Sequence, residues 1–136
     1  MPKASILLAD DNAFILDHVR QLLERDGQFD IVASVRNADA IVGEAARLKP
    51  DVVILDISMG DVNGIDVATE LRDSGSRSKV VFLTVHDDAE SVNAAMGAGG
   101  SAYVVKTRLS IDLASAIRAA LANKLFVSPS LMFKEK

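Results

Sequence analysis

The chain contains 136 residues, of which 49% are hydrophobic and 25% are charged, a composition typical of one globular domain and unlike that of a disordered chain. Its 15 lysines and arginines and 19 aspartates and glutamates give a formal net charge of −4, which argues against direct binding to nucleic-acid phosphates. The absence of cysteine excludes disulfides, thiol nucleophiles, iron–sulfur clusters and thiolate zinc sites.

The N-terminal residues bear on location. Met1-Pro2-Lys3 leads directly into Ile6-Leu7-Leu8, without the apolar region and small-residue cleavage site of a signal peptide. No apolar stretch approaches the roughly 20 residues that a membrane helix needs. We therefore expect a cytoplasmic protein that does not enter a membrane.

Five short apolar runs, rich in valine, isoleucine and leucine, are the candidate strands. Uninterrupted runs of this kind are typical of strands that are buried on both faces of a parallel sheet. The runs are residues 5–9, 31–35, 52–55, 80–84 and 102–105.

A segment with helical periodicity follows each run. In the first segment Ile15, Val19 and Leu23 fall on one helical face, and Asp26-Gly27 ends it. Strict strand–helix alternation predicts an α/β fold, a doubly wound (βα)5 arrangement with helices on both faces of a five-stranded parallel sheet. We expect one folded domain at residues 1–122 and a C-terminal tail, or the start of a linker, at residues 123–136.

In an open α/β sheet, ligands bind beyond the carboxyl ends of the strands. Four of the predicted strands are followed there by polar side chains, whereas the second strand ends without an acid, as an edge strand would. The polar residues at the ends of those four strands are Asp10, Asp11, Asp56, Thr84 and Lys106. Three converging carboxylates repel one another and favour a bound cation. Oxygen ligands without a neighbouring histidine or cysteine indicate a hard ion, and we expect Mg²⁺.

Four ordered motifs contain these residues. They are Leu8-Ala9-Asp10-Asp11-Asn12, Pro50-Asp51-Val52-Val53-Ile54-Leu55-Asp56-Ile57-Ser58-Met59 with Gly64 following, Phe82-Leu83-Thr84-Val85-His86, and Tyr103-Val104-Val105-Lys106. Together they resemble the receiver domain of bacterial two-component response regulators, over roughly residues 5–121. Details such as Lys106-Thr107 are most similar to the nitrate-regulator subfamily, whose receivers precede a helix-turn-helix DNA-binding domain. The resemblance implies the flavodoxin-like strand order 2-1-3-4-5.

The resemblance also implies a phosphorylation-activated signalling switch. Asp56 would accept a phosphoryl group from a sensor histidine kinase or a phosphotransfer protein and form an acyl phosphate. Lys106 would pair with the phosphoryl oxygens, and the Thr84 hydroxyl would hydrogen-bond to one of them. Thr84 and Tyr103 would form the switch itself, unless Tyr103 is simply a half-buried strand aromatic. Hydrolysis of the acyl phosphate would reset the switch slowly, so we expect a phosphoacceptor and not an enzyme.

The implied metal ligands belong to two strand ends. Asp11 and Asp56 would ligate Mg²⁺ directly, Asp10 mainly through water, and the backbone carbonyl of Ser58 would complete the protein ligands. Gly60 stands where the family often has proline, which predicts a more mobile loop there and bears on Mg²⁺ affinity.

One further difference from the family and the two histidines lead to separate expectations. Thr107 replaces a proline that often follows a cis bond, so we predict a trans 106–107 peptide. His86 either tunes dephosphorylation together with Ser58 or is an exposed loop histidine. His18 is expected at the surface or in packing rather than as a ligand.

The resemblance suggests that residues 88–121, the fourth helix, fifth strand and fifth helix, form an output or homodimer face, the alternative being a plain solvated surface. The DNA-binding output domain would lie outside this chain. Three other functions remain open: a phosphorylation-independent interaction module, an aspartyl-phosphate hydrolase and a flavodoxin-like FMN carrier. The adjacent Asp10-Asp11 pair differs from the Asp-x-Asp of the hydrolases, and the flavin-binding loop and aromatic residues of the carriers are missing.

Overall fold

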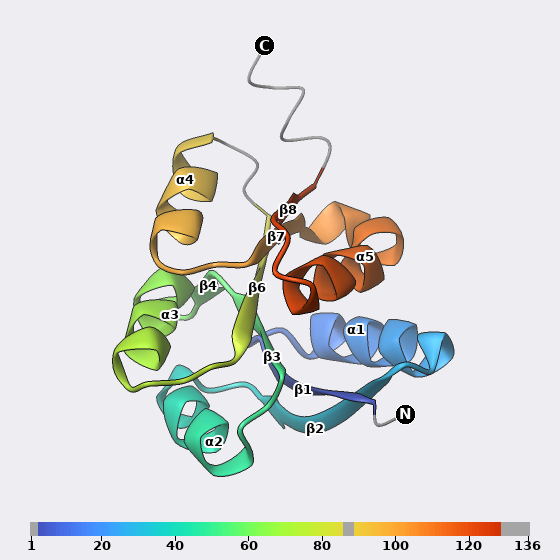
Figure 1. Ribbon diagram of the computed structural model, residues 1–136, viewed down its shortest axis with the longest axis horizontal. Helices are drawn as coiled ribbons and strands as arrows, with labels where there is room; N and C mark the ends of the chain where they lie inside the picture. Colours follow the sequence, from blue (N-terminus) through green and yellow to red (C-terminus); the bar gives the residue numbers. More distant parts are fainter. Residues whose placement is uncertain (1–2, 86–88, 129–136) are drawn as a thin grey trace.

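The computed structural model describes residues 3–85 and 89–128 as a parallel sheet between two layers of helices (Figure 1). The sheet has six strands in the order β2-β1-β3-β6-β7-β8, and every neighbouring pair is parallel. Its strands are β1 (Ala4–Ala9), β2 (Phe29–Val35), β3 (Val52–Asp56), β6 (Lys79–Thr84), β7 (Ala102–Val105) and β8 (Phe126–Val127). The predicted α/β class and the predicted order of the first five sheet strands are confirmed.

Alternate strand residues face opposite cores. Leu7 and Val53 point into the core beneath α2, α3 and α4, whereas Ile6 and Val52 point into the core beneath α1 and α5. This two-sided burial explains why the strands carry uninterrupted apolar runs. The helices are α1 (Ala13–Asp26), α2 (Ile41–Leu48), α3 (Gly64–Asp73), α4 (Ala89–Gly97) and α5 (Leu109–Leu121), with short 3-10 turns η1 (Ala38–Ala40) and η2 (Lys106–Arg108).

The sequence did not predict three short strands. β4 (Ser58–Met59) and β5 (Val62–Asn63) form an antiparallel hairpin after β3, and β8 pairs with β7. The five-stranded sheet is therefore corrected to six strands, and β8 lies inside the segment predicted as a tail. Phe126 packs against one core and Val127 against the other, which gives this segment a reason to dock.

A local signal ends α1 where the sequence predicts. Gly27 caps α1 in the left-handed conformation, with φ of 80°, and its N–H donates to the carbonyl of Leu23.

No cis peptide bond occurs in the described parts of the chain, which confirms the trans 106–107 peptide. Within those same parts, no helix combines the length and the apolar character needed to cross a membrane.

Candidate functional site

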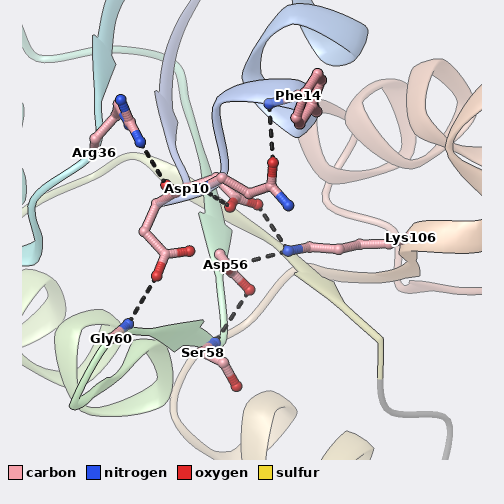
Figure 2. Close-up of polar contacts among 9 residues, drawn as sticks. Asp10, Phe14, Arg36, Asp56, Ser58, Gly60 and Lys106 are labelled. Carbon is pink, nitrogen blue, oxygen red and sulfur yellow. Dashed lines mark hydrogen bonds and ion pairs between the residues drawn. The ribbon is translucent and has the colours of Figure 1, made fainter.

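The predicted site residues meet at the carboxyl edge of the sheet. Asp10 follows β1, Asp56 ends β3, Thr84 ends β6 and Lys106 follows β7. Asp10, Asp56 and Thr84 are almost fully buried, with exposed fractions of 0%, 2% and 1%, while Asp11 is exposed. One carboxylate oxygen from each of Asp10, Asp11 and Asp56 lies within 4.8 Å of the others, so the structure brings the three acids together (Figure 2).

Lys106 is the cation that faces this cluster. Its Nζ lies 2.9 Å from Asp10 Oδ2 and 3.2 Å from Asp56 Oδ2, as Figure 2 shows. The ammonium therefore neutralises part of the charge of two buried carboxylates at once. Removing it would leave both acids buried without that compensation, which is far more costly than losing an exposed ion pair.

The two carboxylates at the ends of β1 and β3 are held by the same kind of turn. Asp10 Oδ1 accepts a hydrogen bond from the N–H of Asn12 at 2.8 Å, and Asp56 Oδ1 accepts one from the N–H of Ser58 at 3.1 Å. In each case an aspartate binds the amide two residues ahead, the pattern of an Asx turn. One oxygen of each carboxylate is therefore fixed locally, and the other faces Lys106.

Asp10 Oδ2 is the atom that most needs a further partner. It is buried and accepts no hydrogen bond from the described residues, although Lys106 Nζ lies at ion-pair distance. The 2.9 Å contact with Lys106 compensates the charge of this oxygen but leaves its hydrogen-bond acceptor capacity unused. A buried acceptor beside two more carboxylates fits a hard divalent cation.

Burial is the main reason that Asp56 resists ionisation. Desolvation, followed by the nearby negative charge of Asp10, raises the pKa of Asp56 from its ordinary value of 3.8 to about 6, against the opposing pull of Lys106 and of the Ser58 N–H. A cation bound at the cluster would favour the carboxylate form in the same way that Lys106 does. The site is thus poised to gain from added positive charge.

The loop after β3 is built around close backbone contacts. The N–H of Gly64 donates to the carbonyl of Ile57 at 2.6 Å, and a Cβ at position 64 would collide with the carbonyl oxygen of Asp56. Gly60, in the turn between β4 and β5 with φ of 62°, donates its N–H to Asp11 Oδ2 at 3.0 Å. The β4–β5 hairpin, which follows β3, is therefore hydrogen-bonded to Asp11, which follows β1.

Thr84 and Tyr103 lie on neighbouring strands. Tyr103 is fully buried in the core beneath α2, α3 and α4, so the alternative of a half-buried ring is wrong. Thr84 is buried at the end of β6, next to β3. Their role as a switch stays a prediction.

The remaining expectations concern side chains around the cluster. His86 lies outside the described residues. His18 is exposed, with Nε2 3.5 Å from Ser110 Oγ, and does not join the acids. Sequence reasoning assigned no role to the N–H groups of Asn12, Ser58 and Gly60. The two Asx turns were accessible from the sequence, because aspartate often binds the amide two residues on; the Gly60 contact depends on an unpredicted hairpin.

Comparisons with known proteins agree with this geometry. The profile of the response regulator receiver domain family matches residues 6–118. The nitrate/nitrite response regulator protein NarP of Escherichia coli K12 is 35% identical over 130 residues, which cover 93% of this chain and 60% of NarP. A nitrate/nitrite response regulator homologue of Haemophilus influenzae is 30% identical over 129 residues, 95% of this chain and 62% of that protein. The chain thus spans less than two thirds of these relatives.

Among solved structures, a two-component response regulator of the LuxR family from Aurantimonas sp. SI85-9A1 superposes with a TM-score of 0.91 at 27% identity. The match covers 97% of this chain and 94% of that one. A LuxR-family DNA-binding response regulator from Staphylococcus aureus matches with a TM-score of 0.80 at 28% identity, over 87% of this chain and 98% of the other.

Proposed function

The chain belongs to the response regulator receiver domain family, and on that premise we propose that Asp56 is its phosphoacceptor. Receivers of this family are signalling switches of two-component systems and not classical enzymes. The observation that carries the proposal is the position of Asp56: it is buried at the end of a central strand, with Lys106 Nζ 3.2 Å from one oxygen and two further acids alongside.

The chemistry follows from this arrangement. A carboxylate oxygen of Asp56 attacks the phosphorus of a phosphohistidine or of a small phosphodonor. The new P–O bond forms as the bond to the leaving group breaks, and the leaving group takes up a proton. Lys106 holds positive charge where the phosphoryl oxygens arrive, and the Thr84 hydroxyl offers a hydrogen bond. Asp56 must be ionised for this attack.

The acidic cluster supports Mg²⁺ as the cofactor. Asp10, Asp11 and Asp56, together with the backbone carbonyl of Ser58, would hold the ion, and the buried Oδ2 of Asp10 is the acceptor with spare capacity. When bound, Mg²⁺ neutralises charge on the transferred phosphoryl group. Asp11 is positioned for this by the N–H of Gly60.

The partners follow from the family and stay proposals. The phosphodonor would be a sensor histidine kinase or a phosphotransfer protein. The output would be transcriptional, as the name of the DNA-binding response regulator from Staphylococcus aureus suggests. The face formed by α4, β7 and α5 would transmit the change to an output domain or to a second copy of the chain.

The test is intact-mass spectrometry after incubation with acetyl phosphate, with and without Mg²⁺. We expect one Mg²⁺-dependent phosphoryl adduct on the wild type and none on Asp56→Ala. Asp51→Ala is the matched control, because Asp51 is an exposed acid next to the opposite end of the same strand, and it should be phosphorylated normally. An adduct that persists in Asp56→Ala would contradict the proposal, and repeated turnover of a phosphate ester would favour the hydrolase alternative.

A further inference from the structure

Residues 126–128 occupy the outer edge of the strand that leads into the site. β8 pairs in parallel with β7, with Phe126 opposite Ala102 and Val127 opposite Tyr103. Val127 packs in the same core as Tyr103, and Phe126 packs in the core on the other face. The segment that follows α5 therefore touches both layers of the molecule.

Ser128 adds two hydrogen bonds beyond the paired residues. Its N–H donates to the carbonyl of Tyr103 at 3.0 Å, and its Oγ accepts a hydrogen bond from the N–H of Val105 at 3.1 Å. Ser128 is fully buried, with an exposed fraction of 0%. A fully buried hydroxyl on an edge strand is unusual, because serine is mostly exposed unless its polar atom has a partner.

The two hydrogen bonds of Ser128 hold the part of β7 that leads directly into the site. Val105 is the last residue of β7, and Lys106, whose ammonium contacts Asp10 and Asp56, comes next in the chain. Ser128 therefore fixes the backbone amide immediately before the residue that must meet the phosphoryl group. It also holds the carbonyl of Tyr103, so β7 is held from the same edge at Tyr103 and at the residue before Lys106.

We propose that Ser128 is a positioning residue for Lys106, so that docking of β8 on β7 and occupation of the phosphoryl site favour each other. The inference rests on the proposed function of Asp56. In the structure β8 is docked while the Lys106 ammonium lies at the site, so one arrangement contains both features and we expect a positive coupling. Because coupling free energies are reciprocal, an occupied site must hold β8 more firmly to the same extent.

The first experiment uses the wild-type chain. Beryllium trifluoride with Mg²⁺ serves as a phosphoryl mimic, and amide hydrogen exchange is followed residue by residue by NMR. We expect the amides of Val105 and Ser128 to exchange more slowly when the mimic is bound. An unchanged exchange rate at both amides in the bound protein would overturn the inference.

The second experiment separates positioning from stability. Ser128→Ala removes the hydroxyl that binds Val105 and should weaken the affinity for beryllium trifluoride by about two- to tenfold, the value of one ordinary hydrogen bond. Ser78→Ala is the matched control: its hydroxyl also binds backbone, the carbonyl of Pro50 at 2.6 Å, beside the start of β6 and away from the site. Its affinity should be that of the wild type.

The outcomes distinguish this inference from the proposed function. Asp56→Ala provides the baseline without the carboxylate that beryllium would bind. If the wild type binds the mimic and Ser128→Ala binds it equally well, Ser128 only holds the strand and the inference fails, whatever happens to the melting temperature. If the wild type does not bind the mimic at all, the inference fails together with the proposed function.

Discussion

The carboxyl of Asp56 is surrounded by groups that act on its ionisation in opposite directions. Burial and Asp10 favour the protonated form, and Lys106 with the Ser58 N–H favours the carboxylate. The first pair prevails, which is why the pKa of Asp56 is raised to about 6. The residue that the reaction needs as an anion is thus destabilised as an anion until positive charge is added.

This predicts how Asp56→Asn changes stability with pH in the absence of Mg²⁺. Well below pH 3.8 Asp56 is protonated in both the folded and the unfolded chain, so the variant and the wild type should be similar. As pH rises through 6, the wild type loses stability, because its folded-state pKa of about 6 exceeds the ordinary 3.8. At pH 8 the variant should be more stable by about 3 kcal/mol.

Urea denaturation at pH 4 and pH 8 measures this difference, with Asp17→Asn, an exposed position in α1, as the control. Added Mg²⁺ should stabilise the wild type at pH 8 more than the variant. A variant that gains nothing between the two pH values would show that burial does not raise the pKa of Asp56 in the folded protein.

A second prediction at this scale concerns Gly64. A methyl group there would collide with the Asp56 carbonyl oxygen and lie 2.9 Å from the Ile57 Cα, so Gly64→Ala should cost about 1–3 kcal/mol and slow phosphorylation of Asp56. Gly43→Ala is the control, since a Cβ at that position in α2 meets nothing within 4 Å. Denaturation and the phosphorylation rate measure both effects; equal behaviour of the two variants would refute the close approach.

Most of the site residues could be predicted from the sequence because they stand at the ends of predicted strands. Asp10, Asp56, Thr84 and Lys106 directly end or follow apolar runs, and parallel strands place such residues at one edge. The simultaneous contact of Lys106 with Asp10 and Asp56 could not be predicted from the sequence. It depends on side-chain rotamers and on the relative positions of the strand ends.

At the scale of elements, asparagine caps place two helices next to the site. The side chain of Asn12 accepts from the N–H of Phe14 at the start of α1, and that of Asn63 accepts from the N–H of Ile65 at the start of α3. Each cap satisfies an amide that the helix cannot pair internally. The helices therefore begin at defined residues directly after the loops that bear Asp10, Asp11 and Asp56.

Asn63→Ala should lower the free energy of unfolding by about 1 kcal/mol, because the Ile65 amide loses its partner. Asn93→Ala, an exposed position within α4, is the comparison and should change stability by less than about 0.5 kcal/mol. Urea denaturation of both variants measures the difference. Equal stabilities would mean that the cap does not contribute to α3.

Element prediction succeeded where patterns are long and failed where they are short. The five apolar runs and the helix-ending signal at Gly27 were sufficient for the central sheet. β4, β5 and β8 each contain two residues, which is too few for a periodic pattern to emerge. Their pairing is decided by tertiary contacts, such as those of Phe126 and Val127 with the two cores.

At the scale of the whole molecule, the sheet lies between the two cores and contributes residues to both. Tyr103 belongs to the core beneath α2, α3 and α4, while its neighbour Val104 belongs to the core beneath α1 and α5. A shift of β7 is therefore felt on both faces. This arrangement provides a physical route from the phosphoryl site to the α4, β7 and α5 face proposed for output.

The sixth strand also affects the tendency of the protein to self-associate. All four residues of β7 are buried, and β8 covers the edge that they would otherwise present to other molecules. A chain ended at residue 122, the boundary predicted from the sequence, would expose an apolar strand edge, a template for intermolecular pairing. Light scattering should detect self-association in this shortened chain and not in one ended at residue 128; equal scattering would mean that the β7 edge is protected without β8.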